Sequence, residues 1–528
     1  MEEGAMNDVR IPVLIVGAGV AGLACADLLA QHGVESVLVE KRREAFVYPK
    51  ARNLTFRTLE ILRALGLSDQ VHAVADGVSG VVLKPALTST SAEPAMDVDA
   101  IFDEFVGLSP EPVAQYCPQS HLEPILLADI RRRGSQVRYG TSLSSFTEDA
   151  HGVTAELSSE TGTETVHADY LIAADGVHSP IRTALGIDTS GYGALPIFVV
   201  FIYFRGRWRS VVPELGEGDA VQVRNSDVDG IFLAIDGDRG MFITTYLPQS
   251  GESAEQFTPE HCRRVLTAAI GESIDLEIIE VAPWRPYEQV ATQFRSGRTY
   301  LVGDAAHTMP PFKAGGANTA IQSAQNLAWK LAAVHHGVAG PGLLATYHDE
   351  RYPIGRFAAR QSLVGPPLAL LKLDGSVPGL SAGEEAPLFT MVLGYQYHSA
   401  AVASDHASAG TVTFVDALTG QPGTRMPHIW LPRDGKRVST LDLIGSGFAL
   451  FIAGEPAAWT AAAARVAATF GVEVAVHMLG DDGAAHTGLG AGGALLIRPD
   501  DFVGWRVETL PSDPETALRQ SLSAILDR

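Results

Sequence analysis

Residues 11–40, IPVLIVGAGVAGLACADLLAQHGVESVLVE, hold the clearest structural signal in the chain. Residues 11–16 are a short apolar run rich in β-branched side chains, which is typical of a buried parallel strand. Glycines at G-x-G-x-x-G spacing then open a helical pattern, and residues 36–39 return as a second strand. The order strand, glycine turn, helix and strand predicts a dinucleotide-binding βαβ unit.

The glycines and the acid that ends the second strand have separate predicted roles. Gly17 lets the chain turn tightly, Gly19 lets the backbone approach a pyrophosphate, and Gly22 lets the helix pack close to the strand. The helix N-terminus offers unpaired N–H groups and a partial positive charge to the phosphates. Glu40 stands where an acid is expected to hold a ribose hydroxyl. The alternative is a glycine-rich turn in an ordinary α/β fold, and this stretch does not identify the dinucleotide.

The length and composition indicate a globular protein of several domains. The chain has 528 residues, which is too long for a single core. We find no apolar run of the roughly 18 residues that a transmembrane helix needs. The first ten residues, MEEGAMNDVR, lack the apolar segment of a signal peptide. The net charge of −22 argues against nucleic acid and anionic membranes as partners.

The three cysteines, Cys25, Cys117 and Cys262, are scattered along the chain. Their odd number and wide spacing predict neither a disulfide framework nor a metal cluster. Cys25 lies within the first predicted helix, so we interpret it as a small packing residue. Free cysteines of this kind are typical of a reducing compartment, which predicts a cytoplasmic protein.

Two later segments repeat the pattern of a buried strand that ends at an acid. Residues 170–174, YLIAA, lead to Asp175, after which Ser179 can cap a helix that begins with Pro180. Residues 298–302, RTYLV, lead to Asp304, and a proline- and glycine-rich loop then opens onto a long helix from about residue 318. Strand ends are where α/β folds bind ligands. We therefore favour a functional role for Asp304 over a turn cap, and we interpret His307 as a satisfied loop histidine.

The middle and the end of the chain have different patterns. Residues 195–248 read as short strands separated by turn signals, which predicts an antiparallel sheet. Past about residue 400 the order is β-α-β-β-α, as in a thioredoxin-like domain, although this part has no cysteine and so no thiol redox chemistry. A capping box of Ser512 and Glu515 is expected to start the last helix.

Three motifs in one order carry a family resemblance: GAGVAG at 17–22, DGVHSPIR at 175–182 and GDAAHTMPP at 303–311. Together they resemble the flavoprotein aromatic hydroxylases, the family of p-hydroxybenzoate hydroxylase and phenol hydroxylase. The segments PHIWLPRDGKRVSTLDL and IRPDDFVGWR near the C-terminus are similar to the bacterial polyketide hydroxylases such as aklavinone 11-hydroxylase.

The resemblance implies an α/β fold with three parts. A discontinuous, Rossmann-like FAD-binding domain would comprise residues 1–75, 116–186 and 285–398. An antiparallel-sheet substrate domain would comprise residues 76–115 and 187–284. The C-terminal thioredoxin-like domain, without C-x-x-C, would span residues 399–528.

The resemblance also implies FAD at the first site, with Arg52 beside the pyrophosphate and the mobile flavin and Gln119 near the ribitol. Asp175 and Gly176 would touch both FAD and NADPH, and Asp304 would bind the ribitol or ribose. Phe312, Lys313 and Ala314 depart from the small residues common in the loop that lines the flavin ring. The full set implied to bind cofactor is Gly17, Gly19, Ala21, Gly22, Glu40, Lys41, Arg52, Gln119, Asp175, Gly176, Gly303, Asp304, Pro311, Gly315, Gly316, Ala317 and Asn318.

The implied reaction is the hydroxylation of a phenolic, polyketide-like substrate. NADPH would reduce FAD, O2 would add to form a C4a-hydroperoxide, and an electron-rich ring carbon would take the distal oxygen. The protein would place the ring and exclude water, while the cofactor carries the difficult step. No metal site or catalytic triad is visible, and Arg52 and Pro311 are the candidate catalytic residues. The candidate substrate contacts are Phe201, Tyr203, Phe232, Tyr246, Trp284 and Pro311, although aromatic residues at alternate strand positions are also typical of a core.

Other functions stay open at this point. Baeyer–Villiger insertion or another oxidation by the same flavin peroxide would use the same fold. A flavin-binding protein without turnover would bind FAD but show no substrate-stimulated NADPH oxidation. A plain NAD(P) dehydrogenase is disfavoured, because the motifs at Asp175 and Asp304 would then have no role. The choice between NADPH and NADH and the presence of a homodimer also stay open.

Overall fold

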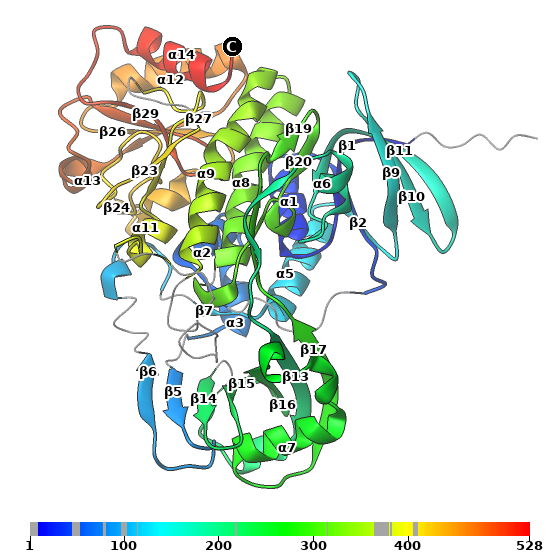
Figure 1. Ribbon diagram of the computed structural model, residues 1–528. Coiled ribbons are helices and arrows are strands. Elements are labelled where there is room, and N and C mark those ends of the chain that lie inside the picture. The colour runs from blue at the N-terminus through cyan, green and yellow to red at the C-terminus, as the bar shows by residue number, and fades with distance from the viewer. Residues whose placement is uncertain are drawn as a thin grey trace, which may run out of the picture.

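The computed structural model describes residues 9–44, 53–77, 81–96, 103–112, 115–216, 219–313, 315–363, 380, 383–404 and 410–528. Figure 1 shows a central layer of strands and helices, a mostly antiparallel sheet below it, and a C-terminal α/β domain against the helices α8 (Gly315–His335) and α9 (Thr346–Gln361). This arrangement confirms the predicted fold class. The exact domain boundaries stay a prediction.

The central sheet is built around the strand that opens the chain. β1 (Val9–Val16) pairs in parallel with β2 (Ser36–Glu40) on one side and with β11 (Gly162–Ala173) on the other, and β11 pairs in parallel with β20 (Thr299–Leu301). The antiparallel strands β9 (Ser142–Glu148) and β10 (Val153–Ser159) extend β11 at one end. The order across the sheet is β19 (Arg295–Ser296), β20 (Thr299–Leu301), β11 (Gly162–Ala173), β1 (Val9–Val16), β2 (Ser36–Glu40) and β8 (Gln136–Tyr139).

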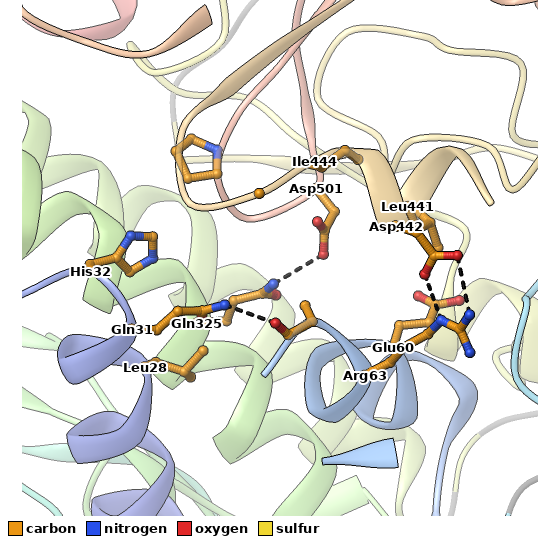
Figure 2. A pocket seen from close by; sticks show the side chains of 13 residues that line it. Leu28, Gln31, His32, Glu60, Arg63, Gln325, Leu441, Asp442, Ile444 and Asp501 are labelled. Carbon is orange, nitrogen blue, oxygen red and sulfur yellow. Dashed lines mark hydrogen bonds and ion pairs between the residues drawn. The ribbon is translucent and has the colours of Figure 1, made fainter. Parts of the chain in front are cut away.

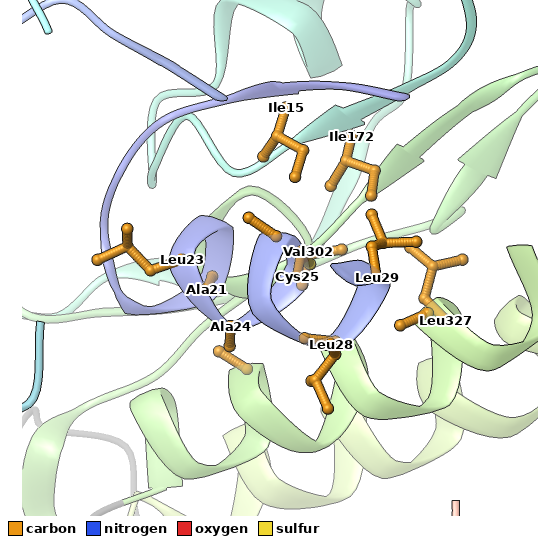
Figure 3. Close-up of a cluster of buried hydrophobic side chains, with 14 of the residues drawn as sticks. Ile15, Ala21, Leu23, Ala24, Cys25, Leu28, Leu29, Ile172, Val302 and Leu327 are labelled. Carbon is orange, nitrogen blue, oxygen red and sulfur yellow. The ribbon is translucent and has the colours of Figure 1, made fainter. Parts of the chain in front are cut away.

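Helix α1 (Val20–Gln31) lies between this sheet and helix α8 (Gly315–His335). In Figure 3, Ile15, Ile172 and Val302 of the strand side contact α1 from one direction and Leu327 of α8 lies on the other. A helix covered on several faces must be apolar nearly all round, as the sequence of α1 is. Cys25 is buried in this cluster, which confirms it as a packing residue. No helix in the described ranges is both long and apolar enough to span a membrane.

Three further helices frame the central sheet and the start of α8. They are α2 (Phe56–Ala64), α5 (Gln119–Arg132) and α9 (Thr346–Gln361). Two small antiparallel sheets join the segments between them: β3 (Asn53–Leu54), β7 (Gln115–Tyr116) and β4 (Asp76–Gly77) in one, and β12 (Thr189–Ala194), β18 (Tyr287–Ala291) and β21 (His307–Thr308) in the other.

The lower sheet has two apolar faces with different neighbours. Because successive side chains of a strand point to opposite faces, Ile202 and Phe204 lie on one face while Phe201 and Tyr203 lie on the other. Helix α7 (Pro259–Ile270) covers the first face. The strand order is β17 (Leu276–Trp284), β13 (Val199–Gly206), β16 (Arg239–Thr245), β15 (Asp229–Asp236), β14 (Ala220–Arg224), β5 (Val81–Lys84) and β6 (Glu93–Met96).

The C-terminal domain packs on α8 through an apolar cluster in which Trp329 meets Phe448. Helices α12 (Ala457–Phe470) and α14 (Pro514–Ile525) pack against the same cluster, and α13 (Gly480–Thr487) follows β27. β26 pairs in parallel with β27 and antiparallel with β28. The strand order is β27 (Val474–Met478), β26 (Phe448–Ile452), β28 (Ala494–Ile497) and β29 (Val503–Val507).

Helix starts agree with the sequence except in two places. Ser179 caps α6 (Pro180–Ala184) as predicted, with its Oγ accepting from the amide of Arg182 at 3.0 Å. The predicted capping box at α14 is wrong, because Asp513 is the N-cap and accepts from the amide of Thr516 at 3.1 Å. Pro514 favours the first helical position, which makes the residue before it the cap. Helix α8 begins at Gly315, earlier than predicted.

Candidate active site

Three predicted ligand-binding segments leave the central sheet at one edge. Val16 pairs with Ala173, and Ala173 pairs with Leu301, so β1, β11 and β20 end side by side. The amide of Ala174 donates to the carbonyl oxygen of Val16, and the amide of Val302 to that of Ala173, both at 2.9 Å. The glycine turn and the loops that carry Asp175 and Asp304 are therefore neighbours, at the edge where α/β sheets bind ligands.

The three glycines of the turn differ in what surrounds them. A Cβ atom on Gly17 would lie 2.2 Å from the carbonyl oxygen of Ala174, and one on Gly22 would lie 1.9 Å from that of Gly17. Gly17 also has a φ of 107°, which favours glycine. A Cβ atom on Gly19 would meet no protein atom within 4 Å. The first and third glycines are thus required by close packing, while the second faces open space.

The start of α1 is suited to an anion. Gly19 is its N-cap, and among the described residues no side chain caps it and no acid stands in its first turn. The first amides of a helix have no partner within the helix. These amides and the open space at Gly19 therefore fit the pyrophosphate of a dinucleotide such as FAD. Ala21, in this first turn, is buried.

Glu40 lies beside the glycine turn at the end of β2. Its Oε2 accepts a hydrogen bond from the amide of Ala18 at 2.9 Å, and its Oε1 accepts one from the amide of Arg42 at 3.0 Å. A carboxylate has about four lone-pair positions, so it can accept further bonds from ribose hydroxyls. Lys41 is exposed next to it. The ribose contact itself stays a prediction.

Asp175 is engaged in capping the helix that follows it. Its Oδ1 accepts from the Ser179 hydroxyl at 2.6 Å and its Oδ2 from the amide of Ile181 at 3.1 Å. Burial raises the pKa of Asp175, although these hydrogen bonds oppose the shift. Gly176 has a φ of 91°, which turns the chain away from the strand. Contact of this turn with FAD and NADPH stays a prediction.

Arg182 joins two of the motifs, a role that the sequence analysis missed. Its guanidinium donates to the carbonyl oxygens of Ala305 and Val177, each at 2.8 Å. Burial lowers the pKa of Arg182, and the Asp175 carboxylate opposes this shift. The only available signal was an arginine in the first turn of a short helix at a strand end. Nothing in that pattern indicates which carbonyl groups it reaches.

The loop after β20 presents Asp304 to solvent. The residue lies in a short 3-10 turn, Gly303–Ala305, and its carbonyl oxygen accepts from the Thr308 hydroxyl at 3.0 Å. The side chain is exposed at the same edge as the glycine turn. Its predicted contact with the FAD ribitol stays a prediction.

His307 is not the satisfied loop histidine that we expected. Neither of its ring nitrogens has a hydrogen-bond partner among the described residues. The ring is buried and packs against Phe294, with 5.8 Å between the ring centroids. Burial lowers the pKa of His307 to about 3, so it is neutral near pH 7.

The start of α8 meets the segment that follows Arg52. Asn318 accepts from the amide of Thr55 at 2.9 Å through its Oδ1 and donates to the carbonyl oxygen of Asn53 at 3.0 Å through its Nδ2. Arg52 itself lies outside the described residues. Asn318 therefore holds β3 against the loop that is predicted to line the flavin ring.

The rest of this loop is partly described. Pro311 is exposed at the start of a 3-10 turn, Pro311–Lys313, and Lys313 pairs with Glu385 at 2.8 Å. Gly315, Gly316 and Ala317 form the first turn of α8. Gln119 begins α5 and is half-buried. The described members of the predicted cofactor set thus lie at a strand end, in loops or near helix starts.

One face of the lower sheet gathers aromatic side chains. The rings of Phe201 and Trp284 stack with centroids 5.7 Å apart, and Tyr203 meets Phe201 edge-on at 6.3 Å. Leu363, which follows α9, packs in the same cluster as Phe201 and Trp284. In addition, β18, which follows β17, pairs with β21 just before the loop that holds Pro311. This face is therefore next to the cofactor-binding part.

Phe232 and Tyr246 are on the other side, which corrects the predicted substrate set. Phe232 is fully buried and packs on Phe204 and Trp208 beneath α7. Tyr246 packs against the same cluster and meets Phe257. In the strand ladder Phe232 lies opposite Phe242, so it shares the α7 face. Residues one position apart in register point to opposite faces, and this parity was not visible in the sequence.

Comparison with known proteins agrees with the geometry. Residues 10–362 match a family described as FAD binding domain, and residues 419–528 match aromatic-ring hydroxylase, C-terminal. The chain is 38% identical to a tetracenomycin A2 monooxygenase-dioxygenase of Streptomyces glaucescens, over 99% of this chain and 98% of that protein. It is 39% identical to a tetracenomycin B2 monooxygenase-dioxygenase of Streptomyces olivaceus, over 99% of this chain and 100% of that protein.

A solved structure is similar over the whole length. It is a ternary complex of aklavinone-11 hydroxylase with FAD and aklavinone, with a TM-score of 0.88 and 32% identity. The match covers 99% of this chain and 100% of that chain.

Proposed function

Because the chain belongs to the FAD-dependent aromatic-ring hydroxylases, we propose that it hydroxylates a phenolic, polyketide-like substrate with electrons from NAD(P)H. The observation that carries the proposal is the meeting of three strand ends, at Gly17, Asp175 and Asp304, beside an aromatic sheet face. A dinucleotide at this edge and a planar ring on this face would be neighbours.

The residues of the chain would bind the cofactor, orient the substrate and shield the reacting ring from water. Bound FAD supplies the chemistry, since it can take two electrons from a nicotinamide and pass one atom of O2 to an electron-rich ring carbon. The first amides of α1 would hold the pyrophosphate, and Glu40 the adenosine ribose. The start of α8 and the segment held by Asn318 would position the flavin end. The apolar sheet face would exclude water from the reacting ring.

The substrate class is inferred from the aromatic face and from the relatives. Phe201 and Trp284 offer stacked rings, which favour a planar polycyclic partner. The two similar enzymes act on tetracenomycins by name, and the similar structure contains aklavinone. We therefore propose a fused-ring polyketide phenol rather than a single-ring phenol. We propose NADPH as the electron donor, bound transiently.

A second candidate is a reaction that adds more than one oxygen atom. Both tetracenomycin enzymes carry the words monooxygenase and dioxygenase in their names. Baeyer–Villiger insertion also remains an alternative, because reduced FAD and O2 can also supply an oxygen atom to the carbon next to a ketone. A homodimer and a cytoplasmic location stay predictions, and size-exclusion chromatography would test the first.

The test begins with the purified protein. We expect a yellow flavin spectrum, NADPH oxidation that rises with polycyclic phenols, and a product that carries one oxygen atom from 18O2. A product with two or more labelled atoms would favour the second candidate, and NMR would separate a phenol from a lactone. A colourless protein that FAD cannot reconstitute would contradict the cofactor. Bound FAD without substrate-stimulated NADPH oxidation would favour a non-catalytic flavin-binding protein.

A further inference from the structure

Helix α2 presents three charged side chains, Arg57, Glu60 and Arg63, to the C-terminal domain. Residues three apart lie on one side of a helix. We propose that the C-terminal domain, through Asp501 and its neighbours, positions α2 and with it the segment that reaches the flavin. This inference rests on the proposed function, because it assigns the domain a part in flavin placement.

The first contact is a buried arginine at the centre of the interface. Arg57, about 1% exposed, donates to Asp501 Oδ2 and to the carbonyl oxygen of Asp500, each at 2.8 Å. It also donates to Gln325 Oε1 of α8 at 2.6 Å, and Gln325 in turn donates to Asp501 at 3.0 Å. The charge of Arg57 is therefore matched by a carboxylate of the C-terminal domain.

The next two contacts follow along the same side of α2. Glu60 accepts from Arg425 Nε at 3.1 Å and forms a second ion pair with the same guanidinium. It also accepts from the Ser109 hydroxyl at 2.7 Å. Arg63 donates to both carboxylate oxygens of Asp442, at 2.6 and 3.1 Å. Three ion pairs thus join α2 to residues far away in the sequence.

Figure 2 shows that Glu60, Arg63, Asp442 and Asp501, which take part in these contacts, border a pocket. A cavity of about 160 Å³ lies between α1, α2 and α8 on one side and the C-terminal domain on the other. Dashed lines join Arg63 with Asp442 and Gln325 with Asp501 across it. Apolar side chains of α2 such as Leu59 and Leu62 pack in the central core, whereas on the side that faces the C-terminal domain the ion pairs are its directional contacts.

The N-terminal end of α2 is where the flavin site begins. Its N-cap, Thr55, is bonded by Asn318, which also bonds the carbonyl oxygen of Asn53. β3 pairs with β7, which ends at Tyr116, shortly before Gln119. A tilt of α2 would therefore move residues 53–55. This movement would disturb the predicted flavin contacts of Asn318 and Gln119. A small misplacement of such a segment can cost a large factor in rate.

A purely structural role is the competing explanation. Breaking a buried pair leaves an uncompensated charge and destabilises any fold. The chain offers a matched control, because Glu350 of α9 pairs with Lys330 and with Arg498 of the C-terminal domain but does not touch α2. Loss of that pair would also weaken the contact between the two domains, but it would reach α2 only indirectly, through Arg498 and the Asp500 carbonyl oxygen that accepts from Arg57.

The test compares Asp501→Asn with Glu350→Gln in the full-length enzyme. Asn keeps the shape of the side chain and tolerates the left-handed backbone of Asp501, whose φ is 68°. We measure hydrogen exchange of residues 53–64 in the FAD-free protein, the rate of flavin reduction by NADPH, and product formed per NADPH. Asp442→Asn is a milder second variant, since its pair with Arg63 is partly exposed.

We expect Asp501→Asn to speed exchange in residues 53–64 and to slow flavin reduction by roughly 10- to 100-fold. Glu350→Gln should lower the melting temperature but change the exchange and reduction rates much less, because it reaches Arg57 only through Arg498 and Asp500. Equal losses of stability without any change in exchange or reduction would overturn the proposal. If Asp501→Asn does not fold, unchanged exchange in Asp442→Asn would overturn it. If NADPH cannot reduce the flavin of the wild-type enzyme, that result would instead contradict the proposed function. The exchange data would still decide whether the C-terminal domain positions α2.

Discussion

The guanidinium of Arg182 donates to the carbonyl oxygen of Ala305 at 2.8 Å, and this hydrogen bond joins the loop after β11 to the turn after β20. A second bond, to the carbonyl oxygen of Val177, spans the loop itself. Both carbonyl groups belong to segments that we expect to contact FAD. The arrangement of the sheet edge that we expect to bind FAD thus depends on Arg182, which does not need to touch the cofactor.

Replacing Arg182 with Met should therefore weaken FAD binding and the fold together. Each carbonyl group left without a partner costs about 1–3 kcal/mol if it stays buried. If the cost of one such group falls on the FAD-bound state, FAD affinity should fall by roughly 5- to 140-fold. Titration of the FAD-free protein measures it. Arg10→Met serves as the control, because Arg10 forms an exposed pair with Asp169 and should matter little. An unchanged FAD affinity in Arg182→Met would contradict this role.

Two alanine substitutions in the glycine turn should have opposite consequences. Gly22→Ala places a Cβ atom 1.9 Å from the carbonyl oxygen of Gly17, so the protein should be strongly destabilised or fail to fold. Gly19→Ala meets no protein atom within 4 Å and should fold with nearly the wild-type melting temperature when FAD is absent. Its FAD affinity should fall, because the new methyl group occupies the space of the pyrophosphate.

Thermal unfolding with and without FAD separates the two effects. FAD should raise the melting temperature of the wild type much more than that of Gly19→Ala, since a ligand stabilises by its affinity for the folded state. Equal stabilisation of both proteins by FAD would show that Gly19 does not face the cofactor.

A buried acid on α1 should give the enzyme a pH-dependent stability. Burial raises the pKa of Asp27 from its ordinary value of 3.8 to about 8, and the nearby Asp129 carboxylate adds to the shift. Arg133, whose Nε lies 3.1 Å from Asp27 Oδ1, opposes it. Since the pKa is higher in the folded state than in the unfolded state, the contribution of Asp27 is complete below its ordinary pKa. It is lost progressively as the pH rises through about 8.

Asp27→Asn removes this titration and should flatten the pH dependence. The melting temperature of the variant should rise relative to that of the wild type as the pH increases from about 5 to about 9. Calorimetry or fluorescence melts at constant ionic strength would measure the difference. A difference between the two proteins that is constant over this range would argue against a protonated Asp27.

The two faces of the lower sheet should respond differently to truncation. Trp284→Ala removes a ring stacked on Phe201, so KM for a polycyclic substrate should rise by roughly 2- to 12-fold, the equivalent of about 0.5–1.5 kcal/mol. Phe232→Ala creates a cavity beneath α7 and should cost about 3–5 kcal/mol of stability with little change in KM. Steady-state kinetics and thermal melts on both variants test this. A larger KM effect in Phe232→Ala than in Trp284→Ala would contradict the assigned faces.

Much of the cofactor site could be predicted because its signals are local. The βαβ unit of β1, α1 and β2 and the cap at Ser179 follow from short spacings that the structure confirms. Backbone sterics and helix caps act within a few residues, so the sequence contains the needed information. Even here a competing local signal can win, as at Asp513, where the proline after it displaced the expected capping box.

The sequence by itself determined the family and the need for glycine at positions 17 and 22, and it predicted the edge of the sheet that binds FAD. These properties depend on residues that are close together along the chain. Only the tertiary structure decided that Phe201 faces the cofactor part while Phe232 faces α7, because strand register sets the side on which each ring lies. It also decided that Arg57 and Glu60 are buried against Asp501 and Arg425. Charged residues on a helix are typical of a solvent-exposed face, and only folding brings their distant partners within hydrogen-bond distance.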